Sequence, residues 1–426
     1  MEKNKKNVPK IRFKGFTEEW VEEKLGELSE PLRYGLNAAS TIYDDINKYI
    51  RITDIHDETH IFDYKDLTSP NTNLNEVSDY QLKDNDLLFA RTGASVGKTY
   101  LYRKTDGIVY YAGFLIRARI KSNFDSEFIF QNTLTNQYNN FVKITSQRSG
   151  QPGINAREYS SWSLIIPKMK DEQTQIGNYF QNIDKLIEAK QSRIDKLKNI
   201  KKACLEKMFP KKGATTPEIR FKGFSGEWEE KKLGNLMDVT SVKRIHQSDW
   251  TNFGIRFLRA RDIVSAFKNE KQTDLLYISI EKYAEYSTIS GKVKKGDLLV
   301  TGVGTIGVPL LITNNEPVYF KDGNIIWFKN NNIIHSNFFF YSFVGDGIRN
   351  FINESAGIGT VGTYTIESGK KTPILLPLNW DEQEQIGTFF KTLDNLISQN
   401  EQQLTKLKNI KKACLEKMFV NKEDAL

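Results

Sequence analysis

The chain has 426 residues, of which 39% are hydrophobic, 27% are charged and 12% are aromatic. This length suffices for two or more domains with their own cores, and the aromatic content argues against a disordered chain. No stretch reaches the roughly 18 apolar residues of a membrane span, and no apolar segment follows the basic N-terminal run, as a signal peptide requires. The net charge of +8 is compatible with a polyanionic partner but does not identify one.

The sequence repeats itself after about half of its length. IRFKGF opens at Ile11 and again at Ile219, and a tryptophan and a Leu-Gly pair follow each copy. KLKNIKKACLEKMF at 196–209 is identical at 406–419, and a DEQ-x-QIG motif precedes both copies. This period is too long for a solenoid array, so we interpret the chain as a duplicated half-molecule.

Two divergent inserts, at about 30–165 and 238–372, lie between the matched flanks. Helices are expected around 126–141 and 336–351. Short apolar runs punctuated by Gly, Asn and Asp predict strands at 86–90, 108–111, 114–117 and 297–300. Each insert is therefore predicted to be a mixed domain with a β-rich core. Matched flanks around two divergent inserts indicate one structural unit that is used twice, each time to recognise a different target.

The repeated C-terminal segments predict two long helices, at 171–210 and 381–420. Their apolar residues follow alternating steps of four and three, which is typical of a coiled-coil seam. Asp171 and Asp381 are predicted to cap the N-termini. If the helices run antiparallel, the two inserts lie at opposite ends of a rigid bar. Neither helix can bury its stripe alone, so we expect an interface formed by Ile183, Ile187, Ile194, Leu197, Leu393, Ile397, Asn400, Leu404 and Leu407.

Four polar residues interrupt this seam. A polar residue at a seam position can set the register of two helices at a cost in stability. For the lysines, we favour stems that cover the seam while the ammonium groups stay in water. Asn400 is the better candidate for setting the register, and the lysines are Lys190, Lys201 and Lys411.

Glycine-rich turns follow equivalent predicted strands, at 93–97 in the first insert and 302–307 in the second. Glycines let backbone N–H groups approach a phosphate, and Ser95 or Thr305 adds a hydroxyl group. A tight turn that serves only the fold is an equal alternative. Later segments, at 149–154 and 355–361, form a second pair. Near them, Arg148 and Gln151 have side chains that can read guanine or adenine edges, although most such residues simply contact solvent.

The sequence contains no recognisable catalytic constellation. The turn ending in Gly97-Lys98-Thr99 is one residue short of a phosphate-binding loop, and a predicted strand follows it in place of the required helix. Glu22-Glu-Lys24 and its counterpart at 229–231 echo the E-x-K of some nucleases but are interpreted as surface helix. The histidines and cysteines show no metal-ligand spacing. The chain is therefore predicted to be non-catalytic.

With these features, the chain resembles the specificity subunit of type I restriction–modification systems. The opening segments, the D-L-L turns, the DEQ-x-QIG motifs and the duplicated helices occur in the family's order and cover nearly the whole chain. The resemblance implies an α+β fold with internal pseudo-twofold duplication, in which two long antiparallel coiled-coil helices join two mixed α/β target recognition domains. The implied boundaries are recognition domains at 1–170 and 219–380, helices at 171–210 and 381–420, and a linker at 211–218.

The resemblance also implies a role for each part. Each recognition domain is expected to read one half of a split asymmetric site in double-stranded DNA. The helices are expected to set the spacing and dock two methyltransferase subunits, which restriction or motor subunits can join. S-adenosylmethionine, ATP and Mg are then expected on the partner subunits, with no cofactor in this chain, and the location is expected to be cytoplasmic, away from membranes. Because the recognition domains diverge, the resemblance itself supplies no base-contacting residue. Chosen from the residues of this chain, the expected DNA contacts are Arg91, Thr92, Ser95, Lys98, Arg148, Gln151, Arg259, Arg261, Thr301, Thr305 and Lys321.

Two other functions fit the residues. One is a non-catalytic coiled-coil scaffold that displays two protein-binding heads, which lacks the steep salt dependence of a phosphate-binding protein. The other is an NTPase hidden in the inserts, whose activity would depend on Lys98.

Overall fold

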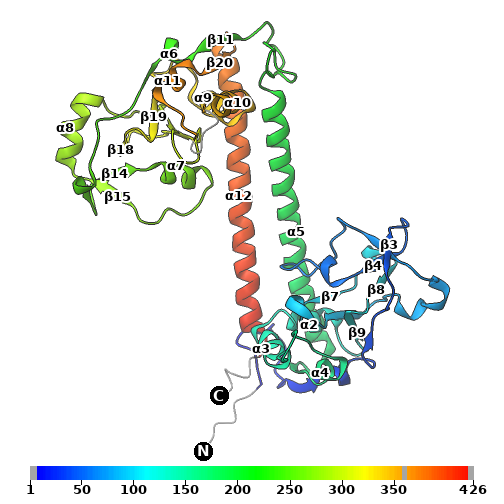
Figure 1. Ribbon diagram of the computed structural model, residues 1–426. Coiled ribbons are helices and arrows are strands. Elements are labelled where there is room, and N and C mark those ends of the chain that lie inside the picture. The colour runs from blue at the N-terminus through cyan, green and yellow to red at the C-terminus, as the bar shows by residue number, and fades with distance from the viewer. Residues whose placement is uncertain (1–6, 357–361, 421–426) are drawn as a thin grey trace, which may run out of the picture. The chain divides into compact units, whose positions relative to one another are not determined.

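The computed structural model describes residues 7–356 and 362–420 (Figure 1). The chain forms two compact units that are interleaved in sequence. Unit 1 comprises Met1–Gln191 together with Gln402–Leu426, and unit 2 comprises Ser192–Glu401. None of the helices in the described part of the chain combines the length and apolar character needed to span a membrane.

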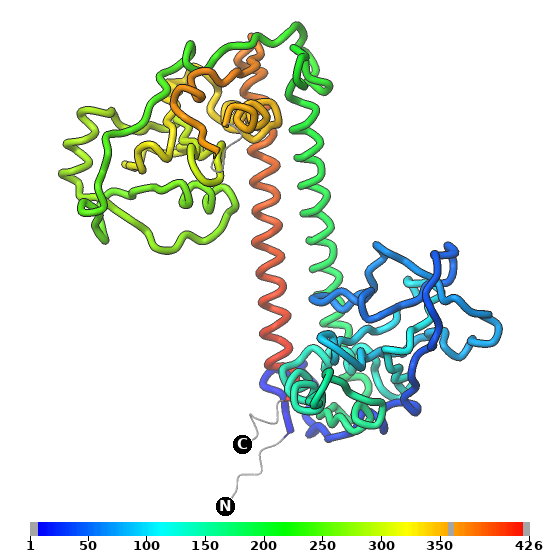
Figure 2. The backbone as a smooth tube through the Cα atoms, in the orientation of Figure 1, coloured from blue at the N-terminus to red at the C-terminus, as the bar shows by residue number. Residues whose placement is uncertain are grey.

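The two long helices explain the interleaving. Helix α5 spans Lys170–Lys207 and helix α12 spans Trp380–Met418, so each of them contributes residues to both units. Figure 2 shows the red C-terminal end of α12 beside the blue opening segment and the cyan helices of unit 1, to which it belongs. Contiguous domain boundaries, such as those expected from the sequence, do not describe unit 1, because it combines two separate stretches of the chain.

Head 1 is the part of unit 1 from β1 to β10. Its central antiparallel sheet has the strand order β2-β9-β6-β7, and β4 pairs in parallel with β8. The strands are β1 (Val21–Lys24), β2 (Arg33–Tyr34), β3 (Ser40–Ile42), β4 (Lys48–Ile50), β5 (Thr68–Pro70), β6 (Asp86–Ala90), β7 (Thr99–Leu101), β8 (Val109–Tyr111), β9 (Leu115–Arg119) and β10 (Ser163–Ile166). The helices are α1 (Leu25–Leu28), α2 (Ser126–Asn132), α3 (Asn136–Thr145) and α4 (Ala156–Ser160), with 3-10 turns η1 (Ile52–Asp54), η2 (Leu74–Glu76), η3 (Ser78–Tyr80), η4 (Gly93–Ser95) and η5 (Lys104–Asp106).

Head 2, from β11 to β20, repeats this topology in unit 2. Its sheet has the order β12-β19-β16-β17, and β14 pairs in parallel with β18. The strands are β11 (Glu229–Lys232), β12 (Asp238–Thr240), β13 (Trp250–Thr251), β14 (Ile255–Leu258), β15 (Leu276–Ile278), β16 (Leu298–Thr301), β17 (Pro309–Leu311), β18 (Val318–Phe320), β19 (Ile325–Lys329) and β20 (Pro373–Leu376). The helices are α6 (Leu233–Leu236), η6 (Gln247–Asp249), α7 (Ala260–Phe267), α8 (Ile280–Ser290), α9 (Ser336–Val344), α10 (Asp346–Ser355) and α11 (Ile366–Lys371).

Both sheets are buried on two faces, which explains their nearly continuous apolar strands. In β6, Leu87 and Phe89 join the cluster that contains Phe128 of α2, while Leu88 joins the cluster around Ile50 of β4. In head 2, β16 divides its side chains between two clusters in the same way. The predicted strands at 86–90, 108–111, 114–117 and 297–300 and the helices near 126–141 and 336–351 are confirmed to within a few residues.

Two local predictions were wrong. Glu22–Lys24 lies in strand β1, where Val21 pairs with Ile166, and the equivalent residues of the second copy lie in β11. These segments are therefore edge strands and not surface helices. Asp171 and Asp381 lie inside the first helical turns, because α5 and α12 begin one residue earlier than the predicted caps. The side chain of Asn379 accepts a hydrogen bond from the Asp381 backbone N–H at 2.8 Å and takes the capping role.

The opening segments lock the ends of the long helices together. In unit 1, Arg12 donates two hydrogen bonds of 2.6 and 2.8 Å to the buried Glu172 at the start of α5. The next residue back, Ile11, donates its backbone N–H to the carbonyl of Lys417 at the end of α12, at 2.9 Å. Unit 2 repeats this lock, with Arg220 bound to Glu382 at 2.6 and 2.7 Å and Ile219 bound to the carbonyl of Lys207 at 2.9 Å.

Within each unit the helical segments run antiparallel and bury the predicted seam. In unit 1, hydrogen bonds join Tyr179 to Cys414 and Lys190 to Gln403. The residue number on α12 falls as the number on α5 rises, so the two helical segments run antiparallel. Of the nine predicted interface residues, Leu197 and Leu407 are half-buried and the others are buried. This burial is what an antiparallel seam inside each unit requires.

Lysines at the seam form cross-helix ion pairs, contrary to the prediction of ammonium groups in water. Lys411 binds Asp184 at 2.6 Å in unit 1, and Lys201 binds Asp394 at 2.6 Å in unit 2. Each aspartate also accepts a hydrogen bond from its own head, Asp184 from Gln131 at 2.9 Å and Asp394 from Tyr341 at 2.6 Å. The duplicated pairs thus fix the helices to each other and to the head of the same unit.

Asn400 is buried within the seam, and its side-chain amide donates to the carbonyl of Leu396 on its own helix at 2.7 Å. We expect Asn400→Leu to raise the thermal unfolding midpoint by a few degrees, because it replaces a desolvated amide with an apolar group. If Asn400 also sets the register, the variant should assemble less well with partner subunits. Asn395→Leu, on an exposed position of the same helix, is the control. Lower stability with unchanged assembly would contradict a register role.

Candidate nucleic-acid interface

Three loops of head 1 meet where strand β6 ends. The backbone N–H of Arg91 donates to the carbonyl of Phe114 at 3.1 Å, in the short turn that connects β8 to β9. The carbonyl of Arg91 accepts from the N–H of Ile154 at 2.9 Å, and Thr92 forms a β-bridge with Gly153. The glycine-rich turn and the later segment that the sequence singled out therefore form one site, together with the β8–β9 turn, which it did not single out.

Head 2 builds the same junction from different residues. The N–H of Gly302 donates to the carbonyl of Asn324 at 2.8 Å, and the carbonyl of Gly302 accepts from the N–H of Tyr364 at 2.9 Å. These bonds correspond to those of Arg91 with Phe114 and Ile154 in head 1. Residues 357–361 of the predicted late segment lie outside the described residues. The scaffold of backbone bonds is thus common to both heads, while the side chains that it displays are different.

The glycines of the turns serve the fold. Gly97 and Gly307 have φ of 86° and 76°, a conformation that favours glycine. A Cβ on Gly97 would come within 2.6 Å of Val142 on α3, and one on Gly307 within 3.0 Å of Ile352 on α10. Their N–H groups donate to backbone carbonyls, as those of Gly93 and Gly302 do. These four amides therefore hold the turns in shape and do not present free donors to a phosphate.

In head 1, acidic side chains neutralise two of the predicted DNA contacts. Lys98 pairs with Asp57 and donates to the carbonyl of Ile55 at 3.0 Å. Arg148 makes two hydrogen bonds to Glu158, at 2.5 and 2.7 Å. Gln151 is exposed, with its amide nitrogen against the turn at Gly93, whereas Thr92 and Ser95 are half-buried. A role of these residues on DNA stays a prediction.

In head 2, most of the predicted contacts are also engaged within the protein. Arg259 binds Asp262 and Asp274, Arg261 pairs with Asp274, and Lys321 lies 3.8 Å from Asp322. Thr301 is buried and its hydroxyl donates to the carbonyl of Thr305 at 2.5 Å, which leaves Thr305 as the exposed hydroxyl of this turn.

A duplicated arginine–aspartate turn escaped the sequence analysis. After β4, Arg51 binds Asp54 through its backbone N–H and its guanidinium at 2.7 to 2.8 Å, and Arg259 binds Asp262 in the same way after β14. The signal was present as IRITDI at 50–55 and LRARDI at 258–263. The inserts therefore share more than their flanks, and this pair shapes the turn that leaves the parallel strands.

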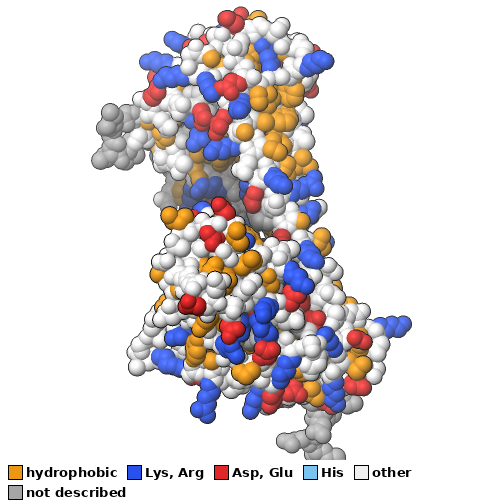
Figure 3. All heavy atoms as spheres, turned by 90° about the vertical axis from the view of Figure 1, so that its right-hand side faces the viewer, with side chains coloured by type: hydrophobic (Ala, Val, Ile, Leu, Met, Phe, Trp, Pro, Cys, Tyr) orange, Lys and Arg blue, Asp and Glu red, His pale blue; other side chains and the backbone are white. Residues whose placement is uncertain are grey.

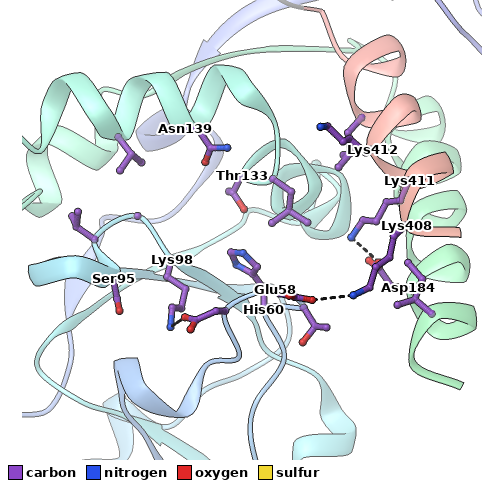
Figure 4. A pocket seen from close by; sticks show the side chains of 18 of the residues that line it. Glu58, His60, Ser95, Lys98, Thr133, Asn139, Asp184, Lys408, Lys411 and Lys412 are labelled. Carbon is purple, nitrogen blue, oxygen red and sulfur yellow. Dashed lines mark hydrogen bonds and ion pairs between the residues drawn. The ribbon is translucent and has the colours of Figure 1, made fainter. Parts of the chain in front are cut away.

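A cleft of about 600 Å³ lies within unit 1, between the glycine-rich turn of head 1 and the two helical segments. Figure 4 shows its lysines reaching toward carboxylates, with Lys408 on Glu58 at 2.9 Å and Lys411 on Asp184 at 2.6 Å. Hydrogen bonding from Lys408 lowers the pKa of Glu58, and burial lowers the pKa of His60, which is therefore neutral near pH 7. Because positive and negative groups are matched, the cleft offers no net charge to an anion.

Charge on the visible surface is mixed in the same way. In the view of Figure 3, Lys and Arg side chains alternate with Asp and Glu side chains and do not gather in one stripe. Among the described residues, no cluster of three or more His, Cys, Asp or Glu side chains is arranged to hold a metal ion.

Comparison with known proteins identifies the family of this chain. The model of the type I restriction modification DNA specificity domain matches residues 17–199 and again 225–409. The chain belongs to this family. The duplication read from the sequence thus corresponds to two copies of a DNA specificity domain, and the predicted specificity-subunit function is confirmed over that of a protein-binding scaffold.

Individual relatives agree. The chain is 24% identical over 359 residues to the type I restriction enzyme MjaVIII specificity subunit of Methanocaldococcus jannaschii, covering 80% of both chains. It is 31% identical over 175 residues to a putative type I restriction enzyme specificity subunit, S.HindORF215P, of Haemophilus influenzae, covering 39% of this chain and 41% of the relative.

A solved structure supports the fold. The type I restriction–modification S subunit from M. genitalium superimposes with a TM-score of 0.64 at 14% identity, covering 97% of this chain and 99% of that one. This likeness extends over both copies of the specificity domain and agrees with the mixed α+β fold expected from the sequence.

Proposed function

We propose that this DNA specificity subunit reads a split asymmetric DNA site, with each head binding one half. The observation that carries this proposal is the loop junction shared by both heads, where the same backbone hydrogen bonds display different side chains. Arg91 and Phe114 stand in head 1 where Gly302 and Asn324 stand in head 2. A constant scaffold with exchanged side chains is what two readers of different sequences require, because base edges are distinguished by side-chain chemistry.

We further propose that the long helices set the spacing between the half-sites and dock two methyltransferase subunits, which restriction subunits can join. The duplication supports two equivalent docking sites, because each unit carries the same pair of apolar helix positions outside the seam. In unit 1 these are Leu186 and Ile410, which are 53% and 39% exposed. In unit 2 they are Leu396, which is half-buried, and Ile200, which is 48% exposed. Exposed apolar side chains at matching places favour identical partners.

In this proposal the chain itself is non-catalytic and works in the cytoplasm, where its DNA target lies. S-adenosylmethionine, ATP and Mg belong to the partner subunits. The near-match to a phosphate-binding loop at 93–99 does not favour an NTPase, since the 3-10 turn η4 and strand β7 follow each other where a helix N-terminus is needed.

Exchange of one head tests the division of labour. Replacing residues 30–165 with the equivalent segment of another family member should change one half of the methylated sequence and leave the other half and the gap unchanged. The physical reason is that the junction and the central sheet β2-β9-β6-β7 of head 1 lie within this segment, whereas the core residues outside it belong to the frame that both copies share. Genome-wide mapping of methylated bases, with partner subunits present, gives the readout.

The reciprocal exchange of residues 238–372 is the matched control and should alter only the opposite half. A change in both halves after either exchange would contradict independent heads, and an absence of any sequence preference in the unexchanged complex would contradict the proposed function.

A further inference from the structure

Arg91 differs from every other predicted cationic contact. Lys98, Arg148, Arg259, Arg261 and Lys321 all have a carboxylate partner within their own head. Within residues 7–356 and 362–420, no carboxylate pairs with the guanidinium of Arg91. Its positive charge is therefore not neutralised inside the protein, although the side chain is half-buried and held in place.

The ring of Tyr34 holds the Arg91 guanidinium. The guanidinium carbon lies 5.0 Å from the centre of that ring, in a cation–π contact. Tyr34 is itself fixed, because its hydroxyl accepts a hydrogen bond from the N–H of Ala156 at 3.1 Å and its strand β2 pairs with β9. A planar guanidinium stacked on an aromatic face keeps its N–H donors at the edge free and oriented, so little rotational freedom remains to be lost on binding.

The backbone of Arg91 is equally constrained. Its N–H and carbonyl both take part in the three-loop junction, and the preceding carbonyl of Ala90 accepts a hydrogen bond from the buried hydroxyl of Tyr159 at 2.7 Å. The side chain thus starts from a rigid point, as a group that must discriminate one base from another requires.

The neighbours of Arg91 suit the edge of a base pair. Phe114, in the β8–β9 turn that bonds to Arg91, is 60% exposed, and Gln151 is exposed on the later loop at 149–154. An arginine fork matches the O6 and N7 acceptors of guanine in the major groove, and a phenylalanine ring favours the methyl group of thymine. An exposed aromatic ring beside an unpaired arginine has no evident role in the core of head 1.

Head 2 has no cation at the corresponding point. Gly302 replaces Arg91, and Asn324, in the turn between β18 and β19, replaces Phe114. The two heads therefore differ in chemistry at a point where their backbone hydrogen bonds correspond, and a guanine contact by Arg91 cannot have a counterpart at the same place in head 2.

We propose that Arg91 is a specificity-determining residue that binds a guanine of the half-site read by head 1, and that Tyr34 is the positioning residue that orients its guanidinium. This proposal rests on the proposed function of the chain as a DNA specificity subunit. Phe114 borders the same contact and shapes the pocket for the neighbouring base.

The test uses the full chain assembled with its methyltransferase partners and a library of DNA duplexes randomised at both half-sites. Arg91→Ala should lower methylation of the best sequence by on the order of 10- to 100-fold and relax the choice of base at one G·C pair of one half-site. Arg91→Lys should also relax that position, because an ammonium group cannot make the two-pronged contact. Tyr34→Leu should give a weaker form of the same loss of selectivity. Tyr34→Phe should keep most of the selectivity, because the ring and the pairing of β2 with β9 remain although the hydrogen bond from Ala156 is lost.

Arg148→Ala is the comparison variant, because it removes a predicted contact whose guanidinium is already bound to Glu158, and its effect on selectivity should be smaller than that of Arg91→Ala. Lys104→Ala is the control, because Lys104 is an exposed cation of head 1 that pairs with Asp84 at 2.6 Å and is not among the predicted DNA contacts. Lys104→Ala should leave the base preference unchanged. The second half-site is an internal control in every variant, and an unchanged thermal unfolding midpoint shows that Arg91→Ala folds.

Three outcomes would overturn the assignment. The half-site of head 1 contains no G·C pair whose replacement reduces methylation, or Arg91→Ala lowers methylation equally on all sequences, or Arg91→Lys is as selective as the parent. The last two results would indicate that Arg91 contacts a phosphate, because loss of a phosphate contact weakens binding to all sequences equally. If the parent complex itself showed no sequence preference, the proposed function would fail, whereas a selective parent with a selective Arg91→Ala variant would refute only the role of Arg91.

Discussion

Residues 1–212 alone are expected to form a dimer that directs methylation to an inverted repeat of the first half-site. In the full chain, head 1 is completed by the end of α12, where Met418 and Phe419 are buried against Phe128 and Phe180. The half-chain lacks that segment but carries its identical copy, 196–209. In the full chain this copy packs within unit 2, most of which is absent from the half-chain. Two half-chains can therefore exchange these segments reciprocally, through an isologous interface with a twofold axis.

The contacts of unit 1 indicate what such a dimer keeps and what it loses. Lys201 of the second copy would replace Lys411 opposite Asp184, so the cross-helix ion pair is retained. Lys190, which donates to Gln403 at 2.6 Å in the full chain, would meet Arg193, the residue equivalent to Gln403. This like-charge contact should weaken the dimer by about 0.3 kcal/mol, and Arg193→Gln should relieve it.

Sedimentation of the half-chain measures the assembly, and methylation mapping with partner subunits measures the sequence that it reads. Phe209→Ala is the informative variant, because Phe209 would occupy the buried site of Phe419 in the partner copy and its loss should favour the monomer. A stable monomer, or a dimer that still directs methylation to an asymmetric site, would show that the two halves are not interchangeable.

The sequence predicted the frame well because the frame is duplicated. Two identical helical segments, two opening motifs and a seam with a period of 3.5 leave few alternatives, and the antiparallel contacts of both units agree with them. The sequence could not show that the units are interleaved, because the pairing of Glu172 with Arg12 and of Ile11 with Lys417 joins residues far apart in the chain. Long-range partners of this kind leave no local pattern.

The candidate site was only partly predictable. The two glycine turns and the late segment were singled out, but the β8–β9 turn that completes the junction was not, because Phe114 was interpreted as one more apolar residue of a strand. Charge partners were equally hidden. Lys98 and Arg259 stand in the sequence as free cations, and only the fold brings Asp57 and Asp262 onto them. Exposure and pairing, which decide whether a cation can reach DNA, are properties of the tertiary structure.

The second prediction with a large expected effect concerns the ion pair between Arg12 of the opening segment and Glu172 at the start of α5. The side chain of Glu172 is only 2% exposed and accepts hydrogen bonds from Arg12 at 2.6 and 2.8 Å and from the indole N–H of Trp20 at 3.3 Å. Glu172→Ala leaves a guanidinium and an indole N–H buried without their acceptor. Removal of one partner of a buried ion pair typically costs about 3–5 kcal/mol, so we expect unit 1 to be strongly destabilised.

Thermal unfolding of the full chain should therefore show an early transition assigned to unit 1, followed by the unfolding of unit 2. Glu382→Ala is the mirror variant, since Glu382 binds Arg220 at 2.6 and 2.7 Å in the same geometry. Its effect should be somewhat smaller and confined to unit 2, because the indole N–H of Trp228 has no hydrogen-bond partner among the described residues to lose. Adding Arg12→Ala to Glu172→Ala should recover part of the loss, because the stranded charge is removed with its partner. Equal shifts of both transitions would contradict this prediction. A loss of less than about 1 kcal/mol in the free energy of unfolding would also contradict it, because that is the size typical of solvent-exposed ion pairs.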